Sequence, residues 1–536
     1  MFNTRHGVFK ARRLAAYQYA PSRAHLRNNK ERANLSFLLV LMFFGVFGVI
    51  VLTEIFMVDE RGRGQGGLPA GPMDQRLPPS ANLTAKDGDW QTVGGTRFKF
   101  LVFSAYFDRR DGNRMIRVVG ATKTRMPERV FCRFWYPADQ QRGLSEQHLT
   151  VPAKVKVIRE NWNLKYSACF VLCLLRHNQT VPQAVSVVAR LRVRPHNMLV
   201  VRELDRPAGM PPPDPLSLAV CVKPLHFSYN RPVEMLEFLE LNTMLGADHF
   251  TFYNHTIGPQ VACILQDYAA RGRVTLLPWK LNMASQREIR TEGLFAALND
   301  CMYRNMNRHS LVALIDLDEF IVPRHNLTLP DLLQWLGKRL NTRSAGSFSF
   351  QNAFFYLQWT DDPLVNRHGL DSRLLTARKT TRRVKLHPHK QRSKYICRPE
   401  FVVEAGNHFV WEFLPGHGAI NVHPSAAILH HYRVCEFGGD DCVKSAHVVD
   451  RTAHRYKDRL AAQVSKRWAL LKDDCGLGDL FIPPLDPPDV LEFEDETLPP
   501  SPASSPQQVD ALNANVPPGA PATDAEPARQ PEAKLS

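Results

Sequence analysis

The sequence contains no Cys-x-x-Cys pair and no internal repeat. The first absence argues against structural zinc, because such sites commonly take two ligands from one such pair. The second absence argues against a repeat architecture. Hydrophobic residues make up 44% of the chain and charged residues 22%, as in ordinary globular proteins, but the formal net charge is +16. The 536 residues suffice for a large core and an appended unit.

Charged residues are also absent from residues 35–53. A helix of this length spans about 28 Å, which is close to the hydrocarbon thickness of a bilayer. Residues 1–34 carry eight Arg or Lys against one Glu, and no small-x-small cleavage site follows the apolar run. A cleaved signal peptide is therefore excluded. We expect a basic cytoplasmic tail over 1–34 and a single transmembrane signal-anchor over 35–58.

Features typical of a lumenal protein lie beyond residue 58. They are the ten cysteines, which suit an oxidising compartment, and four glycosylation sequons, at Asn82, Asn178, Asn254 and Asn326. The pattern predicts a single-pass type II membrane protein. Glycans are expected on Asn82, Asn178 and Asn326, and disulfides are expected with no pairing specified.

Composition divides the lumenal part into segments. Residues 59–96 begin with a Gly-, Pro- and polar-rich stretch and are expected to form a flexible stem. Residues 97–210 hold short aromatic and β-branched runs with a period near two, which predicts a β-rich accessory domain. A Pro-rich boundary precedes the main domain, expected over 215–475. Residues 483–536 contain 13 prolines and are expected to be disordered.

The main domain alternates strand-like and helix-like segments. Strands are expected over 217–222, 249–253, 273–277 and 311–315, and helices over 232–246 and 260–272. The segment "SQRE" at 285–288 resembles a capping box for a third helix. This alternation predicts an α/β fold with a mostly parallel sheet flanked by helices. Ligands of such sheets lie beyond the carboxyl ends of the strands.

The last of these strands runs directly into three carboxylates, in "LVALIDLDEFIVPR" at 311–324. Asp316 and Asp318 share one side of an extended segment, because they are two residues apart. Adjacent carboxylates repel each other unless a cation lies between them, and oxygen ligands suit Mn²⁺ or Mg²⁺. A solvated, Asp-rich strand end is the alternative, since Asp-x-Asp alone is a weak motif. The motif follows the fourth strand of a unit in which strands and helices alternate, and this position favours a metal site.

Four segments, in this order, resemble glycosyltransferase family 92: "CVKPLHFSYN" (221–230), "LNTMLGADHFTFYNHT" (241–256), "YAARGRVTLLPW" (268–279) and "LIDLDEFIVP" (314–323). The resemblance covers roughly residues 215–435. It implies a glycosyltransferase-A fold, a metal-bridged nucleotide sugar, and transfer of galactose from UDP-galactose with inversion. It further implies a Golgi membrane enzyme that acts on glycoprotein glycans, with galactose-terminated acceptors and a β-1,4 linkage as the expectation.

On this interpretation the motif residues have distinct roles. Asp318, with Asp316 directly or through water or sugar, holds Mn²⁺ (alternatively Mg²⁺), which neutralises charge on the departing UDP. Glu319 orients the loop or a sugar hydroxyl. A third metal ligand is expected from "AILHHYR" at 427–433, namely His431 or, as the alternative, His430. A purely structural role for these two histidines is equally compatible with the sequence.

Lys223, Tyr253 and Asn254 stand at strand ends where uridine or ribose would bind. We therefore expect them, together with Asp316 and Glu319, to contact the nucleotide sugar. Asn254 also begins a sequon, so nucleotide binding there competes with glycosylation. Three further residues could reach the donor or be ordinary surface residues: Arg290, Asn299 and Asp300.

An inverting transfer also needs a base that takes the proton of the acceptor hydroxyl. The sequence does not choose among five carboxylates: Asp361, Asp362, Glu412, Asp440 and Asp441. Residues 378–394 contain eight Arg or Lys and are expected to be a solvated loop or a lid over the diphosphate. The lumenal location excludes nucleic acid as their partner.

Two other functions are compatible with parts of the pattern. A haloacid-dehalogenase-type phosphatase also ends an apolar strand in Asp-x-Asp. Its motif, however, sits on the first strand and continues with a small residue and Thr or Val, where this chain has Glu319 and Phe320. A lectin-like protein that has lost turnover would be expected to lack one Asp of the motif, and both are present. The sequence therefore favours an enzyme.

Overall fold

The computed structural model describes Met42 and residues 83–110, 112–137, 147–203, 213–366, 369–435 and 441–480. Within these residues, no helix is both long and apolar enough to cross a bilayer. The predicted transmembrane segment, apart from Met42, lies outside the described residues, as do the predicted cytoplasmic tail, the Pro-rich tail and Asn82.

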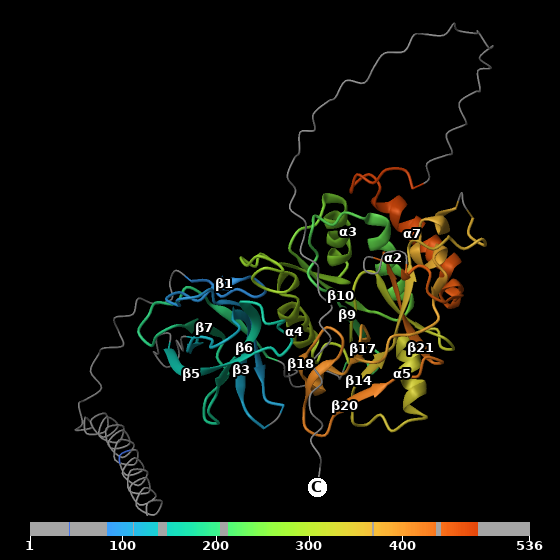
Figure 1. The fold of residues 1–536 in the computed structure, drawn as a ribbon. Coiled ribbons are helices and arrows are strands. Elements are labelled where there is room, and N and C mark those ends of the chain that lie inside the picture. Colours follow the sequence, from blue (N-terminus) through green and yellow to red (C-terminus); the bar gives the residue numbers. More distant parts are fainter. Residues whose placement is uncertain are drawn as a thin grey trace, which may run out of the picture. The chain divides into compact units, whose positions relative to one another are not determined.

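The first sheet is built from residues 91–203 (Figure 1). Its strand order is β1-β2-β3-β6-β5-β4-β7-β8, and an additional pairing of β2 with β8 closes the strands after β1 into a barrel. Apolar side chains such as Val102, Phe134 and Val171 fill the inside and are fully buried. The strands are β1 (Gln91–Thr92), β2 (Leu101–Asp108), β3 (Met115–Lys123), β4 (Phe131–Tyr136), β5 (Gln147–Val157), β6 (Tyr166–Leu174), β7 (Ala184–Val188) and β8 (Leu199–Glu203).

The folded part begins earlier than the expected end of the stem at residue 96. Val93 is buried, Trp90 packs against the core, and β1 pairs with β2. The Asp87 carboxylate accepts a hydrogen bond from Arg304 at 2.8 Å. The expectation of a flexible stem is therefore wrong for residues 83–96, because their few apolar and charged side chains dock onto the folded unit.

The second sheet contains the strands predicted in the main domain. Its order is β11-β10-β9-β12-β17-β14-β20; the first four strands are parallel, and β17 runs antiparallel to β12 and β14. The predicted α/β fold with a parallel sheet is thereby confirmed for this half. The strands are β9 (Leu218–Cys221), β10 (His249–Asn254), β11 (Val274–Pro278), β12 (Leu311–Leu314), β14 (Ala345–Phe350), β17 (Lys394–Cys397) and β20 (Gly418–Asn421).

Three smaller sheets complete this part of the chain. One has the order β13-β21-β15 and carries residues of the site described below. Its strands are β13 (Glu319–Pro323), β21 (Ala427–Arg433) and β15 (Asn352–Tyr356). The other two are the pairs β16 (Thr381–Arg383) with β22 (His447–Val449) and β18 (Val402–Ala405) with β19 (Val410–Phe413).

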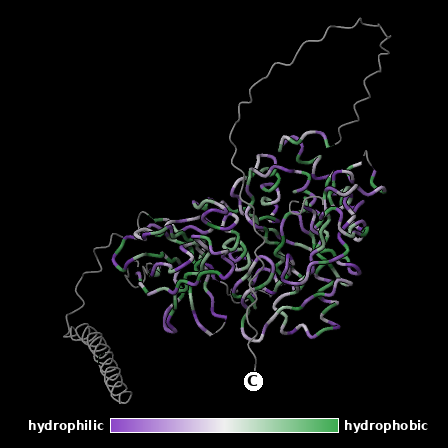
Figure 2. The backbone as a smooth tube through the Cα atoms, in the orientation of Figure 1, coloured by the Kyte–Doolittle hydropathy of each residue, from purple (hydrophilic) through white to green (hydrophobic). Residues whose placement is uncertain are grey.

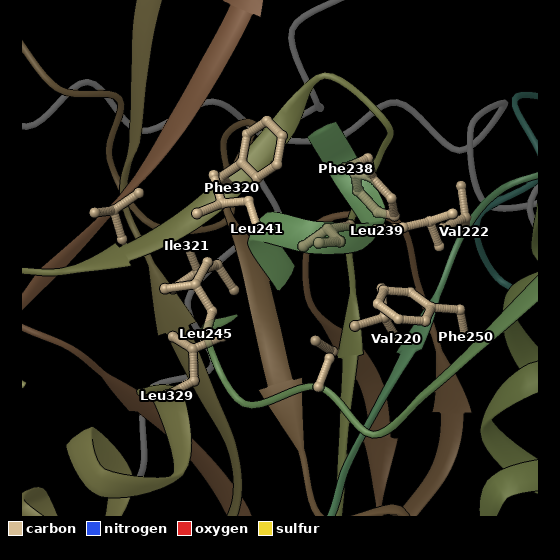
Figure 3. Packing of buried hydrophobic residues seen from close by; sticks show 14 of the residues in the cluster. Val220, Val222, Phe238, Leu239, Leu241, Leu245, Phe250, Phe320, Ile321 and Leu329 are labelled. Atoms are coloured by element: carbon tan, nitrogen blue, oxygen red, sulfur yellow. The ribbon is translucent and has the colours of Figure 1, made fainter. Parts of the chain in front are cut away.

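Helices cover one face of the second sheet. The predicted helices over 232–246 and 260–272 are confirmed as α2 and α3. Phe238 of α2 packs against Phe250, with ring centroids 6.1 Å apart, on the side of Val220 and Val222, whereas Leu241 lies toward Phe320 and Ile321 (Figure 3). The helices are α2 (Pro232–Met244), α3 (Pro259–Ala270), α4 (Leu294–Asn305), α5 (Leu329–Gly337), α6 (Leu375–Arg378) and α7 (Lys457–Leu471). Figure 2 shows hydrophobic residues along the strands of both sheets, with hydrophilic residues between them.

Helix α4 and the barrel cover the other face of this sheet. The intervening strand residues Ala219 and Cys221 belong to a second buried cluster, which includes Leu298 of α4 and Phe103 and Phe170 of the barrel. Burying one such large apolar side chain contributes about 1.5–3 kcal/mol. The barrel is therefore packed into the same core as the parallel sheet.

Asp300 of α4 connects the two sheets through polar contacts. Its carboxylate is fully buried and accepts hydrogen bonds from Ser104 Oγ, Tyr106 OH and Tyr253 OH at 2.5–2.7 Å. Arg304, one turn later, lies 3.0 Å from the same carboxylate and balances its charge. Such a buried charge is tolerated because all its acceptor positions are used.

The start of α4 differs from the prediction. The helix begins at Leu294, and its N-cap is Gly293 with φ of +74°, where a Cβ would lie 2.7 Å from Leu281. Ser285 Oγ accepts the Glu292 N–H at 3.2 Å, and the segment 285–288 forms a separate turn. The predicted capping box is therefore wrong, because its Ser side chain binds a residue seven positions away rather than a helix terminus.

Eight of the ten cysteines form disulfides, as the lumenal interpretation leads one to expect. The pairs are Cys132–Cys173 in the barrel, Cys221–Cys301 between β9 and α4, Cys263–Cys475 between α3 and the end of the described chain, and Cys435–Cys442. Cys169 and Cys397 are buried thiols. The long-range pairs restrict the unfolded chain and so favour the folded state.

Replacing Asp300 by Ala is expected to lower the free energy of unfolding by about 3–5 kcal/mol, because the change leaves several buried hydroxyls without their acceptor and removes one of the two carboxylates, Asp300 and Asp87, that balance the buried Arg304 charge. Urea unfolding of the full chain, followed by tryptophan fluorescence, measures this loss. Asp89→Ala, which removes an exposed ion pair with Lys86, is the matched control and should change stability by less than about 1 kcal/mol. Equal stability of the two variants would contradict a structural role for the Asp300 network.

Candidate active site

The parallel strands of the second sheet end at one edge, and charged residues follow three of them. Lys223 follows β9, His255 follows β10 and Asp316 follows β12. The neighbouring antiparallel strand β17 begins at the same edge with Lys394, since Leu314 pairs with Tyr395. The edge therefore gathers both carboxylates and lysines, at the location where parallel sheets bind ligands.

Asp316 is held between the two lysines. Its Oδ2 lies 3.1 Å from Lys223 Nζ and 3.3 Å from Lys394 Nζ. Burial by itself would raise the pKa of Asp316, but the two ammonium groups outweigh burial and hold it well below its usual range. The same interactions raise the pKa of both lysines despite their burial. Asp316 is thus an ionised carboxylate with two cations beside it.

Glu319 supports the turn between β12 and β13. Its Oε2 accepts the backbone N–H of Asp316 at 3.0 Å and lies 3.5 Å from Lys394 Nζ. The side chain is 2% exposed. Burial, followed by the nearby Asp316 charge, raises the pKa of Glu319, although Lys394 and His431 oppose this shift. The proposed loop-orienting role of Glu319 from the sequence agrees with these contacts.

His431 lies between Glu319 and Asp318. Strands β13 and β21 pair in a register that places Glu319 opposite His431. The Nδ1 of His431 lies 3.1 Å from Glu319 Oε1, and its Nε2 lies 3.3 Å from Asp318 Oδ2. Burial lowers the pKa of His431, but Asp318 and Glu319 together raise it above its usual value. In the protonated imidazole, Nδ1–H donates to Glu319 and Nε2–H donates to Asp318; loss of the Nε2 proton leaves a lone pair that can bind a cation.

His430, the alternative ligand, points to the opposite side of β21. It is fully buried, stacks on Phe355 with ring centroids 4.4 Å apart, and lies 3.2 Å from the Tyr432 hydroxyl. Burial lowers its pKa to about 3. The alternation of side chains along a strand separates the two histidines, so only His431 reaches the carboxylates.

The donors at this edge fit a divalent cation. Asp318 is the most exposed carboxylate of the motif, with 43% of its side chain accessible, and it faces an imidazole nitrogen whose other nitrogen is held by a carboxylate. A carboxylate and a histidine, with a second carboxylate holding the other nitrogen of the histidine, are a recurrent metal-binding combination. Within the described part of the chain, no three acidic, His or Cys side chains are already arranged around one point. Oxygen atoms of Asp316 and Glu319 could complete a set of metal ligands, but they form ion pairs with Lys223 and Lys394.

Some predicted nucleotide contacts are not at this edge. Tyr253 is fully buried, packs on Trp279 and donates to Asp300, so its side chain faces α4 rather than the strand ends. Asn299 and Asp300 are fully buried as well and are not surface residues. The expectation that Tyr253, Asn299 and Asp300 contact the donor is therefore wrong. All three side chains are buried at the α4 face of the sheet, and their polar atoms are hydrogen-bonded within the protein.

The edge also contains residues that the sequence analysis does not predict as site residues. His255 Nε2 lies 3.2 Å from Glu292 Oε2, and Glu292 is buried. His226 follows β9, and burial together with Lys223 lowers its pKa. Asn254 is half-buried at the end of β10 beside them. His226 ends the segment "KPLH" and His255 lies in "YNHT", and both histidines follow strands that the sequence predicts. The parallel pairing of β9 and β10 is what brings the two histidines to one edge of the sheet.

The candidate bases are mostly used in ion pairs. Asp362 is buried and binds Arg451 at 2.7 Å, and its pKa is lowered to about 2, since hydrogen bonds outweigh the effect of burial. Asp361 binds Lys379 at 2.6 Å, and Glu412 binds Lys156 at 2.6 Å. Asp441 is exposed, and Asp440 lies outside the described residues. Salt-bridged carboxylates with lowered pKa are poor proton acceptors.

The basic segment 378–394 is anchored at several points. Lys379 is buried and donates to the Trp359 carbonyl, Arg382 binds Asp450 at 2.8 Å, and Lys394 binds Asp316. A freely solvated loop is therefore the wrong expectation for these positions. Lys394 is the site residue that sequence reasoning missed, because one lysine among many neighbouring cations has no distinguishing pattern.

A cavity of about 720 Å³ lies at the opposite end of the sheet. Its lining includes Leu311, the first residue of β12, and Arg398, which follows β17. The ionisable cluster around Asp316 follows the last residue of β12, so the two locations are distinct. We place the candidate active site at the cluster, because carboxylates, lysines and a histidine meet there at the carboxyl ends of the parallel strands, whereas the cavity lies at their amino ends.

Comparison with known proteins identifies the main domain. Residues 217–476 match the model of "Glycosyltransferase family 92". Two curated relatives, both from Caenorhabditis elegans, are similar: "Glycosyltransferase family 92 protein F13G3.3", 24% identical over 36% of this chain, and "Beta-1,4-galactosyltransferase galt-1", 21% identical over 48% of this chain. The aligned regions span 43% and 52% of those relatives, so the chain matches about half of their length.

Two solved structures have a low similarity to this chain. Glucosyl-3-phosphoglycerate synthase from Mycobacterium tuberculosis, in complex with Mn²⁺ and UDP, is 14% identical with a TM-score of 0.22, over 49% of this chain and 81% of that one. TarS (1–349) of S. aureus is 13% identical with a TM-score of 0.23, over 48% and 73%. Scores of this size transfer neither residues nor ligands.

Glu319→Gln is expected to weaken Mn²⁺ binding about 10–100-fold, because the negative charge that orients His431 is lost. Binding should also weaken as the pH is lowered through the pKa of His431, which its carboxylate neighbours raise above the usual value, because the protonated imidazole cannot bind a metal. Calorimetric titration of the full chain with Mn²⁺ measures both effects. Glu203→Gln, an exposed residue of the barrel, is the control. Unchanged affinity in Glu319→Gln would contradict the orienting role.

Proposed function

Because this chain carries a glycosyltransferase family 92 domain over residues 217–476, we propose that it transfers galactose from UDP-galactose to a glycan acceptor with inversion, forming a β-linkage. The observation that carries this proposal is the pairing of Asp318 with His431 beside the lysine-bound Asp316, at the ligand-binding edge of a parallel sheet. The galactosyltransferase name of one relative supports the donor, and β-1,4 is the linkage that we propose.

The fold proposal is a glycosyltransferase-A arrangement. In it, the parallel strands β11-β10-β9-β12 form the nucleotide-binding half, and the strands beyond β12 form the acceptor half. The strand order and the position of the Asp-x-Asp turn at the boundary of the two halves support this assignment. Ligand sites at such boundaries are typical of open α/β sheets.

The residues at the edge can perform the separate tasks of donor binding. A divalent ion, Mn²⁺ or alternatively Mg²⁺, would be held by Asp318 and His431 and would supply positive charge against the diphosphate leaving group. Lys223 lies beside Asp316 and is 34% exposed, so its ammonium group can contact a phosphate or a ribose hydroxyl. Lys394 is almost fully buried, keeps Asp316 ionised and opposes the rise in the pKa of Glu319. Preorganised charges of this kind need no rearrangement during reaction.

We also propose that the protein is a Golgi enzyme with a single N-terminal membrane anchor and a lumenal catalytic domain. The four disulfides support an oxidising compartment. Asn178 is exposed and Asn326 is half-buried, so the two predicted glycosylation sites within the described residues are at or near the surface. A glycoprotein glycan as acceptor agrees with that location.

Full-length protein, purified in detergent, should release UDP only from UDP-galactose when UDP-sugars are presented with galactose-terminated glycans, and EDTA should stop the release. Asp318→Asn is expected to lower transfer on the order of a hundredfold or more, because it removes a charged ligand at the leaving group. Asp458→Asn, at a position 95% exposed, is the control and should retain full activity. Metal-independent turnover, or full activity of Asp318→Asn, would overturn the proposed mechanism.

A further inference from the structure

The loop between β5 and β6 of the barrel, residues 158–165, lies against the candidate active site. Arg159 N–H donates to Glu404 Oε1 at 2.9 Å, and Lys156, just before the loop, binds Glu404 at 3.0 Å. At the other end of the loop, Tyr166 N–H donates to the Glu288 carbonyl at 2.9 Å. The loop is thus held between two segments of the main domain, residues 284–293 and 404–412.

Glu160 connects this loop to Asp316 through short contacts. Its Oε2 accepts the Asn407 N–H at 3.0 Å and the Trp411 Nε1–H at 3.1 Å. The side-chain oxygen of Asn407 accepts from Lys394 Nζ at 2.8 Å, and Lys394 binds Asp316. Glu160 of the barrel is therefore linked through Asn407 to Lys394, the lysine that pairs with Asp316.

One carboxylate oxygen of Glu160 is available for a ligand. Both hydrogen bonds described above go to Oε2, and among the described residues no donor is bound to Oε1. Burial raises the pKa of Glu160, while the Asn407 and Trp411 hydrogen bonds oppose the shift. A fixed carboxylate with one free oxygen is a suitable acceptor for a hydroxyl group.

Trp162 is the exposed aromatic residue of the loop. Its side chain is 52% exposed, and its backbone has φ of +55°, as does that of Asn163. A left-handed conformation is unfavourable for a bulky residue and persists only where its surroundings enforce it. Here the Arg290 guanidinium lies 4.2 Å from the indole centroid, and the Asn161 side chain accepts the Asn163 N–H at 3.0 Å. The loop thus holds a large apolar face in water beside Arg290.

We propose that this loop forms the acceptor subsite, in which a neutral pyranose sugar stacks on the free face of Trp162 and donates a hydroxyl to Glu160. Ligand sites combine aromatic faces with a few placed polar groups, and a sugar presents an apolar C–H face together with hydroxyls. The contacts from Glu160 through Asn407 and Lys394 to Asp316 link the subsite to the donor edge. This inference rests on the proposed function, and it makes the barrel a part of the enzyme rather than a separate module.

Trp162→Ala in the full chain tests the subsite. At saturating UDP-galactose and Mn²⁺, KM for a galactose-terminated glycan is expected to rise about tenfold, because truncating a central aromatic anchor usually costs at least that factor in affinity. The KM for UDP-galactose and the slow release of UDP without acceptor should stay at wild-type values. Trp162→Phe keeps an aromatic face and should recover most of the acceptor affinity.

Trp335→Ala is the matched control. Trp335 of α5 also carries an arginine over its ring, Arg339 at 4.0 Å, and α5 lines the cavity at the opposite end of the sheet. This variant should keep the wild-type KM for the acceptor. An unchanged acceptor KM in Trp162→Ala, or an equal rise in both variants, would overturn the subsite.

Direct glycan binding separates this inference from the proposed function. Calorimetry with the same glycan and no donor should detect binding to the wild-type chain and weaker binding to Trp162→Ala. If the wild type binds the glycan but transfers no sugar from any donor, the proposed function fails and the subsite stands. If the wild type transfers galactose and Trp162→Ala does so with the same KM, the proposed function stands and the subsite fails.

Discussion

The close approach of Lys223 and Lys394 to Asp316 is the interaction on which the site depends. Three carboxylates within four residues would repel one another at the end of a buried strand, and Asp316 and Glu319 have little access to water. Two lysines from the neighbouring strands β9 and β17 supply the opposing charge. Their positions are fixed by strand pairing, so the electrostatics of the site are a consequence of the sheet order. Asp318, outside this balance, remains open to a ligand.

Much of this arrangement could be predicted from the sequence, and the limits have physical causes. The period of apolar residues located β9 to β12 and α2 to α3, and the parallel sheet then placed Lys223 and Asp316 at one edge. His431 could be proposed because a strand-like run led into it, whereas the choice against His430 needed the side-chain direction. The position of Lys394 depends on the antiparallel pairing of β17 with β12, and the contact between Glu319 and His431 depends on the antiparallel pairing of β21 with β13. Local sequence patterns do not specify these pairings. Tyr253 and Asp300 were misjudged because burial on the α4 face is a tertiary property.

The barrel contributes to the main domain in two ways. Phe103 and Phe170 help to cover the second face of the parallel sheet, and the buried carboxylate of Asp300 binds hydroxyls of the barrel. The β5–β6 loop reaches the charged edge through Glu160 and Asn407. The barrel thus adds to the cover of a face on which α4 and residues of β18 and β19 also pack. The same packing explains why residues 83–96 are ordered: they dock on this joint core through Trp90 and Asp87.

The position of the metal relative to the donor tests this account most directly. Crystals of the protein grown with Mn²⁺ and UDP, measured at the manganese absorption edge, would show where the ion binds. The account predicts one anomalous peak between the Asp318 carboxylate and His431 Nε2, in contact with the diphosphate, with Lys394 still on Asp316. UDP bound at the strand ends without a peak there, or a peak coordinated by other residues, would contradict it.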